Sequence, residues 1–169
     1  METALKLYTL NYSNVKTYLF AILFVVGNIL LPQLAHLAPN GGLIFLPIYF
    51  FTLIAAYKYG IWVGLLTAVL SPLSNYLFFG MPSAGLLPVI MVKSVLLASV
   101  AAYAAHRFGK VSILILIGVV LISQLLGTAF EWAYLKDFYM AVQDFRLGIP
   151  GILIQIFGGY VLLRLIAKI

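Results

Sequence analysis

Six long apolar runs divide this chain almost from end to end, and they constrain its fold more than any other feature. An α-helix of about 20 apolar residues spans the hydrocarbon core of a bilayer. The pattern predicts an all-α integral membrane protein in which six transmembrane helices form one compact bundle, a single membrane domain over residues 1–169. The runs cover residues 17–36, 43–57, 60–79, 86–105, 111–133 and 147–167.

The second and third runs are the least regular of the six. The second is short for a helix that crosses a bilayer upright. Ser71-Pro72 interrupts the third run, and proline removes a backbone hydrogen bond, so we expect a Pro-broken third span. An arrangement with five spans, in which these two runs merge or shorten, stays open.

The composition excludes a water-soluble domain. Hydrophobic residues make up 64% of the 169 residues and charged residues 8%, which is too little polar surface to coat a soluble fold of this size. The absence of cysteine rules out disulfides and thiolate metal sites. Residues 1–13 lack an apolar region followed by a small-residue cleavage site, so we expect no removable signal peptide.

The basic residues predict the orientation of the spans. Positive charge accumulates in cytoplasmic loops. If both termini are in the cytoplasm, the basic residues on the outer side of the membrane are Lys136 and Arg146, and Lys93 lies within a span. The net charge of +6 then reflects membrane orientation and anionic headgroups, and it requires no nucleic-acid partner. The inner side carries Lys6, Lys16, Lys58, Arg107, Lys110, Arg164 and Lys168, with Glu2 as its acid.

Lys93 is the residue whose burial in a membrane costs the most free energy, because it falls well inside the fourth apolar run. A charged group at that depth needs a partner or a wet cavity, and such residues are functional by default. We expect Lys93 to contact an anionic or carbonyl-bearing solute. Snorkelling to a headgroup, or pairing with a carboxylate such as Glu131, is the structural alternative.

Two further regions carry polar groups that a solute could use. Asn75 and Tyr76 follow the Ser71-Pro72 interruption, where broken backbone at membrane depth usually lines a cavity. An interfacial aromatic belt is the alternative for this region. Around the fifth loop, charged and aromatic residues alternate, which suits either a lid over a ligand or a plain extracellular loop. The better candidates there are Glu131 and Trp132, near the end of the fifth run.

Small and polar residues within the runs predict helix contacts. Gly60 and Gly64 are spaced by four, as are Ala98 and Ala102, so that backbones can approach closely. Gln155 lies within the last run, and its amide must hydrogen-bond to a neighbouring helix or to a solute.

Catalytic and nucleotide-binding motifs are missing from the sequence. It contains no HExxH, GxSxG or GxxxxGK[ST] pattern. We therefore expect no enzymatic activity, no cofactor and no metal site. Any ATP hydrolysis would need a separate soluble partner.

The stretch LPIYFFTLIAAYKYGIWVGLLTAVLSPLSNYLFFGMP, residues 46–82, resembles the substrate-binding S components of energy-coupling factor (ECF) transporters. A Pro-bearing second span, a G-x3-G third span, an SPL break and a GMP turn recur in that family. The resemblance implies uptake of a vitamin or similar small organic solute across the prokaryotic cell (inner) membrane. It also implies a membrane coupling subunit and two cytoplasmic ATPases. The implied solute contacts are Asn75, Tyr76, Lys93, Glu131, Trp132, Asp144 and Gln155.

The first apolar run departs from the family pattern. Many S components carry an A-x3-A pair there, against which the coupling subunit packs, whereas this chain has Ala21-x3-Val25 and Gly27-x3-Leu31. The coupling module can therefore be shared, dedicated or absent. The alternative family is that of the MreD-like scaffold proteins of cell elongation, which bind partner proteins and no solute. Polar groups buried in the spans favour the solute-binding family, because a scaffold gains little from them.

Overall fold

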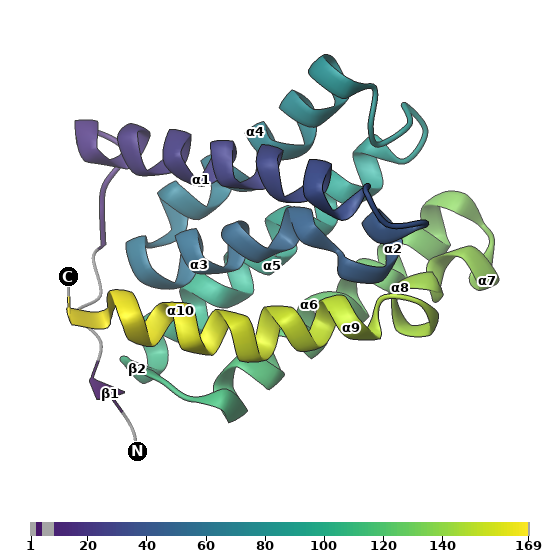
Figure 1. Ribbon diagram of the computed structural model, residues 1–169. Coiled ribbons are helices and arrows are strands. Elements are labelled where there is room, and N and C mark those ends of the chain that lie inside the picture. Colours follow the sequence, from purple (N-terminus) through teal and green to yellow (C-terminus); the bar gives the residue numbers. More distant parts are fainter. Residues whose placement is uncertain (1–2, 5–8, 169) are drawn as a thin grey trace.

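The computed structural model describes residues 3–4 and 9–168, and it is a bundle of helices (Figure 1). Two short strands, β1 (Thr3–Ala4) and β2 (Lys110–Val111), pair antiparallel. The predicted all-α class is confirmed, since these two strands are the only extended pairing among the described residues. The helical elements are α1 (Val15–Ala35), α2 (Gly41–Phe45), η1 (Pro47–Tyr49), α3 (Phe50–Tyr59), α4 (Ile61–Phe79), α5 (Leu87–Phe108), α6 (Ile113–Leu135), α7 (Phe138–Ala141), α8 (Gln143–Arg146), α9 (Ile149–Leu153), η2 (Ile154–Gly158), α10 (Gly159–Leu165) and η3 (Ile166–Lys168).

Among the described residues, four helices are long and apolar enough to cross a membrane, namely α1, α4, α5 and α6. The last predicted run forms a shorter apolar helix, Ile149–Leu165, in which α9, η2 and α10 follow one another without a break. The second predicted run is shorter still. Four of the six predicted spans therefore have the length and hydropathy that a crossing requires.

The second run, predicted as one helix over residues 43–57, is instead three pieces. Helix α2 ends at Phe45, the next residue, Leu46, has a φ of 46°, and η1 and α3 continue from Pro47 to Tyr59. A residue before proline avoids the right-handed helical region, because the proline ring crowds its backbone. Pro47 therefore explains why α2 does not continue through Leu46.

Helix α3 is the centre of the bundle. All residues from Thr52 to Tyr59 are buried. Helices α1, α4 and α5 pack around α3, and α10 also contacts it. From Thr52 to Tyr59, this short helix is therefore surrounded by protein.

Lys58, predicted among the basic residues of the cytoplasmic side, does not lie in an exposed loop. It belongs to the last turns of α3 and is fully buried. The connection to α4 is a single residue, Gly60, whose φ of 95° costs little because glycine has no Cβ. With so short a turn, no loop exists to expose Lys58.

The predicted break at Ser71-Pro72 is wrong, because α4 runs through Pro72 to Phe79. Proline at position 72 removes the backbone donor for the Ala68 carbonyl oxygen, and membrane helices tolerate such a proline when it is packed inside the bundle, as the buried Pro72 is. Asn75 Nδ2 donates to the Ser71 carbonyl oxygen of the same helix at 2.9 Å. The helix ends at Gly80, which takes a left-handed conformation.

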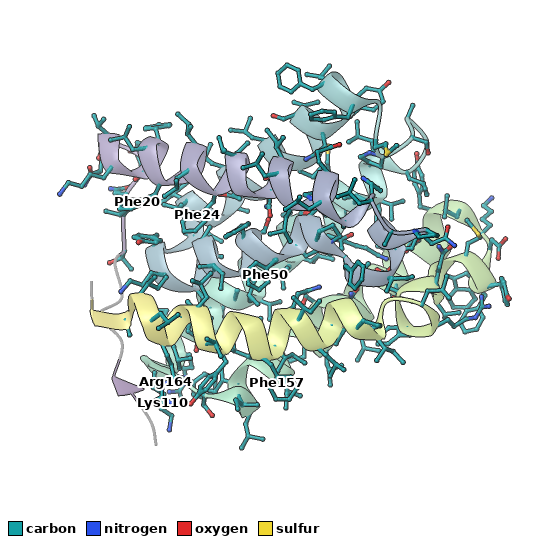
Figure 2. The ribbon with its side chains drawn as sticks, in the orientation of Figure 1. Phe20, Phe24, Phe50, Lys110, Phe157 and Arg164 are labelled. Carbon is teal, nitrogen blue, oxygen red and sulfur yellow. The ribbon has the colours of Figure 1, made fainter. Side chains whose placement is uncertain are left out.

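The outer surface of the bundle is apolar. Exposed positions on α6 include Leu121, Ile122, Leu125 and Leu126, and Phe157 on η2 points away from the bundle (Figure 2). Large apolar side chains outside, and buried polar side chains within a mainly apolar core, suit a protein whose solvent is lipid. The inward positions of α6 are Leu116, Val119, Val120, Ser123, Gln124, Gly127 and Glu131.

The bundle has two distinct ends (Figure 1). What we call the terminal end contains the start of α1, the turn at Gly60, the strand pair and the end of α10. The loop end contains α2, the 80–86 loop, α7 and α8. Lys136 and Arg146 lie at the loop end, whereas Lys16, Arg107, Lys110 and Arg164 lie at the terminal end. Glu2, Lys6 and the side chain of Lys168 lie outside the described residues.

Gly64→Ala is expected to lower the melting temperature. The added Cβ would lie 2.5 Å from the Cβ of Ala56 and 2.8 Å from its Cα, on α3. Overpacking of this kind costs about 1–3 kcal/mol. Gly118→Ala on α6 is the matched control, because its Cβ meets no neighbour within 4 Å. Thermal unfolding in one detergent compares the two, and equal melting temperatures would contradict the close approach of α3 and α4.

Candidate functional site

Lys93 lies at the centre of a buried charge cluster. Its ammonium group forms ion pairs with Glu131 on α6 and with Asp144 on α8, where Nζ donates to Oδ2 at 2.8 Å. The side chain of Lys93 is 5% exposed, and those of Glu131 and Asp144 are 11% and 12% exposed. Two spans and the loop-end segment thus meet at one lysine, which we call the Lys93 cluster.

Gly127 makes room for the lysine stem. A Cβ on this residue would lie 2.7 Å from Lys93 Cγ and 3.4 Å from its Cδ. Gly127 precedes Glu131 by one helical turn on the inner face of α6. The aliphatic part of Lys93 therefore packs against α6 while its ammonium group reaches the carboxylate one turn further on.

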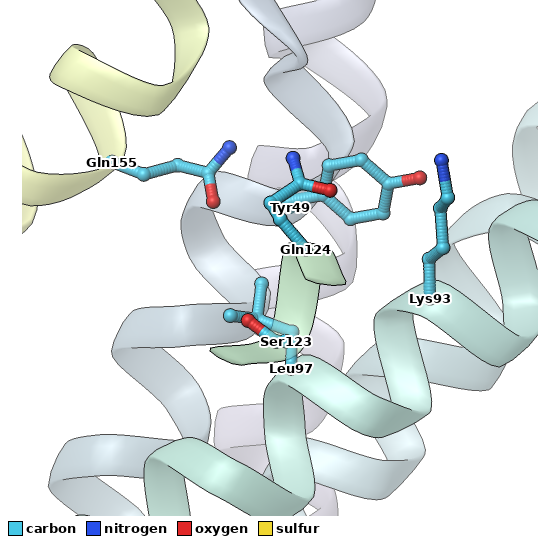
Figure 3. A pocket seen from close by; sticks show the side chains of 6 residues that line it. All are labelled: Tyr49, Lys93, Leu97, Ser123, Gln124 and Gln155. Carbon is cyan, nitrogen blue, oxygen red and sulfur yellow. The ribbon is translucent and has the colours of Figure 1, made fainter. Parts of the chain in front are cut away.

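A small buried cavity adjoins the cluster (Figure 3). Its volume is about 10 Å³, which is room for about one water molecule. In Figure 3 the hydroxyl group of Tyr49 points toward Lys93, and the amides of Gln124 and Gln155 extend into the same space. The lining residues are Tyr49, Lys93, Leu97, Ser123, Gln124 and Gln155.

Gln155 is the most conspicuous polar group of this cavity. It is 1% exposed, and its Nε2 has no hydrogen-bond partner. It lies in η2, a π-helical segment, and such segments occur often at functional sites. A buried donor without a partner costs about 1–3 kcal/mol, which a bound acceptor would recover.

Tyr49 reaches the cavity because of the turn at Leu46. A positive φ is unfavourable for a residue as bulky as leucine, so surrounding contacts must hold it. Leu46 is 4% exposed and packs against Gly148 and Gly151 of the fifth loop and α9. The loop-end segments before α3 and before η2 therefore support each other beside the Lys93 cluster.

Asn75 takes part in a network that joins three helices. Its Nδ2 donates to the carbonyl oxygens of Asn28 and Ser71, both at 2.9 Å. Asn28 in turn donates to the hydroxyl oxygens of Thr52 and Ser71 at 3.0 and 3.1 Å. These bonds hold α1, α3 and α4 together, so the amide nitrogen of Asn75 is engaged within the protein. Its Oδ1 is buried without a partner.

Asn75 also lines a larger groove at the loop end, with a volume of about 550 Å³. Pro32, His36, Leu43 and Ser83 are among the other lining residues. The turn η1 contributes to both spaces, since Pro47 and Ile48 line the groove and Tyr49 lines the small cavity. The groove has the size of a small-molecule site, but its lining has few polar groups and includes no Asp, Glu, Lys or Arg.

Of the predicted solute contacts, the structure brings together Lys93, Glu131, Asp144 and Gln155. Asn75 belongs to the groove, and Tyr76, which is partly exposed, lines neither space. Trp132 is 53% exposed, and its ring packs edge to face on the ring of Phe138, outside the cluster, with the two ring centroids 5.5 Å apart. Trp132 points away because it is the next residue after Glu131, which faces inward on the same helix.

Sequence reasoning missed Tyr49, Ser123 and Gln124. The adjacent polar pair Ser123-Gln124 in the middle of an apolar run was a usable signal, because polar side chains within spans face the interior. Tyr49 gave no signal, since its position depends on the turn at Leu46.

Within the described residues, no group of His, Asp or Glu side chains is arranged to hold a metal ion.

Comparisons of the chain with protein-family models, with curated proteins and with solved structures found no match.

Proposed function

We propose that this protein is a membrane-embedded solute-binding subunit of the S-component type, which takes up a vitamin or similar small organic molecule. The observation that carries the proposal is the Lys93 cluster beside the unpartnered amide of Gln155. Buried charges and unpaired donors cost a bundle folding free energy, so their presence within the spans favours a functional role such as ligand binding. A scaffold that only binds partner proteins on its surface has no use for them at this depth.

Solute binding requires the loop end to open. A vitamin-sized molecule needs about 300 Å³ or more, far above the 10 Å³ of the cavity. The fifth loop, with α7 and α8, connects to the spans through Asp144 and Lys93. Breaking this ion pair and moving the loop would join the small cavity to open solvent, and the groove beyond η1 offers further volume.

Six membrane crossings, with both termini in the cytoplasm, form part of the proposal. Two observations support an even number of crossings: α1 begins and α10 ends at the same end of the bundle (Figure 1). The basic residues Lys16, Arg107, Lys110 and Arg164 also lie at that end, as expected for a cytoplasmic face. The Lys93 cluster, near the loop end, would then face the outside of the prokaryotic cell membrane.

Single cysteines test this orientation. Leu37, Ser83 and Lys136 are exposed at the loop end, whereas Ser13, Lys16 and Phe108 are exposed at the terminal end. Cysteines at the first three positions are expected to react with a membrane-impermeant thiol reagent in intact cells, and those at the other three only after lysis. Labelling of Phe108→Cys from outside would overturn the orientation. Lys58 is unsuitable, because its side chain is buried.

Energy for uptake would come from partners. The sequence contains no nucleotide-binding motif, so a membrane coupling subunit and two cytoplasmic ATPases would drive the transport cycle. A tagged chain, purified gently from its own host, is expected to bring these three proteins with it. Co-purification with cell-elongation proteins alone would instead favour an MreD-like scaffold.

A further inference from the structure

The Lys93 cluster is not electrically balanced. Two carboxylates, Glu131 and Asp144, share one ammonium group, which leaves one negative charge when all three are ionised. Arg146, two residues after Asp144, forms no ion pair with either carboxylate: its guanidinium group contacts the hydroxyl group of Tyr139 and stacks on that ring. A mostly buried negative charge of this kind favours a positively charged ligand.

The neighbouring amide adds a second requirement. Gln155 Nε2 is a hydrogen-bond donor without a partner, and it is directed into the cavity that Lys93 also lines. A donor needs an acceptor, which a bare metal cation cannot supply. The ligand must therefore carry both a positive charge and a hydrogen-bond acceptor, and only a molecule with several atoms combines the two.

We infer that the solute is a small organic cation, with an ammonium or related N–H group that binds between Glu131 and Asp144 and a neutral acceptor that meets Gln155. This inference rests on the proposed function and defines the class of its solute. In the closed state, Lys93 occupies the place of the cation. On binding, the solute takes over one of the two carboxylates from Lys93, and the bound cluster becomes neutral.

The position of Asp144 suggests which carboxylate the solute takes. Glu131 is fixed on a long helix one turn from Gly127, whereas Asp144 comes from α8, a four-residue helix within the fifth loop. When the solute competes with Lys93 for Asp144, the fifth loop would be released from α5. When the cation of the solute then pairs with Asp144, the loop would close over it. Charge recognition and loop closure would thus depend on the same residue.

Other charge classes fit the cluster less well. An anionic solute would pair with Lys93 but would strand two carboxylates, giving a net charge of minus two in a poorly hydrated site. A zwitterion would leave the existing imbalance unchanged. A neutral solute would leave it unchanged as well, so only a cation removes it.

Three probes of one shape test the charge requirement. Tyramine, tyrosol and 3-(4-hydroxyphenyl)propionate share a 4-hydroxyphenyl group, and their tails end in an ammonium, a hydroxyl and a carboxylate group. Each is titrated into the purified protein in lipid nanodiscs, and binding is measured by the rise of the melting temperature. Tyramine is expected to stabilise the protein, and the other two are expected to bind more weakly or not at all.

Asp144→Asn is expected to weaken tyramine binding about 10- to 150-fold, the range for loss of one charge-assisted hydrogen bond. Asp137→Asn is the matched control. It removes a carboxylate from the same loop end, but Asp137 caps α7 and does not contact Lys93, and asparagine caps a helix equally well. Tyramine affinity is therefore expected to be unchanged in Asp137→Asn. Glu131→Gln provides a second variant in case Asp144→Asn does not fold.

Two results would overturn the inference. One is that tyramine fails to stabilise the parent protein, or stabilises it less than either of the other probes. The other is that Asp144→Asn and Glu131→Gln both bind tyramine as tightly as the parent. If neither variant folds, the order in which the three probes stabilise the parent protein decides whether the solute is a cation. If the protein prefers the neutral or the anionic probe, the proposal that it binds a solute still holds, and only the inference that the solute is a cation is rejected.

Discussion

Lys93→Met is expected to destabilise the protein strongly, because it leaves two carboxylates in a mostly buried site without their counter-ion. Removing one partner of a buried ion pair typically costs about 3–5 kcal/mol. Methionine keeps the volume and the apolar character of the lysine stem, so its packing against Gly127 is retained. Thermal unfolding in one detergent and lipid mixture measures the loss.

A triple variant separates charge from packing. Lys93→Met combined with Glu131→Gln and Asp144→Asn replaces the charged cluster by neutral groups, and most of the lost stability is expected to return. Lys16→Met, at an exposed position at the start of α1, is the control for removal of a lysine as such. A Lys93→Met protein that melts like the parent would show that the ion pairs contribute nothing to the fold.

Gln155→Met is expected to change stability and solute binding in opposite directions. The amide Nε2 is buried without a partner, and removing such a group gains about 1–3 kcal/mol of folding stability. The same change removes the donor for the acceptor group of the solute, so affinity is expected to fall about tenfold or more. A residue with a purely structural role would lower the melting temperature when changed and would leave the ligand unaffected.

Gln33 provides the matched control for this prediction. Its Nε2 is also buried without a partner, but it lies on α1 and lines neither the cavity nor the groove. Gln33→Met is expected to raise the melting temperature as Gln155→Met does, with solute affinity unchanged. If Gln155→Met binds solute as tightly as Gln33→Met, the amide of Gln155 does not belong to the site.

The sequence predicted much of the cluster, because charge and burial conflict in a membrane helix. Lys93 and Glu131 each stand within or beside an apolar run, so each needs a partner, and their pairing is the structural alternative that the sequence offers. Gln155 followed from the same argument. Asp144 was included through the resemblance to S components and the charge pattern of the fifth loop. Its ion pair with Lys93 depends on how that loop folds back over the bundle.

The parts that sequence reasoning got wrong depend on contacts between distant segments. The break at Pro72 does not form: α4 continues through the proline to Phe79, and Pro72 is buried within the bundle. Asn75 then points toward Asn28 on α1 and holds helices together. Lys58 is buried because α3 extends to a one-residue turn at Gly60, and only the packed bundle decides how far a short helix continues.

The central claim is that this protein holds a small solute at the Lys93 cluster, and the most direct test is mass spectrometry of what the purified protein releases. The parent protein, purified in parallel with Gln155→Met and Gln33→Met from cells grown in rich medium, is denatured and its small molecules are identified. The account predicts one organic molecule at close to one per chain, retained by Gln33→Met and largely lost from Gln155→Met. Release of lipid and detergent alone from all three proteins would contradict it.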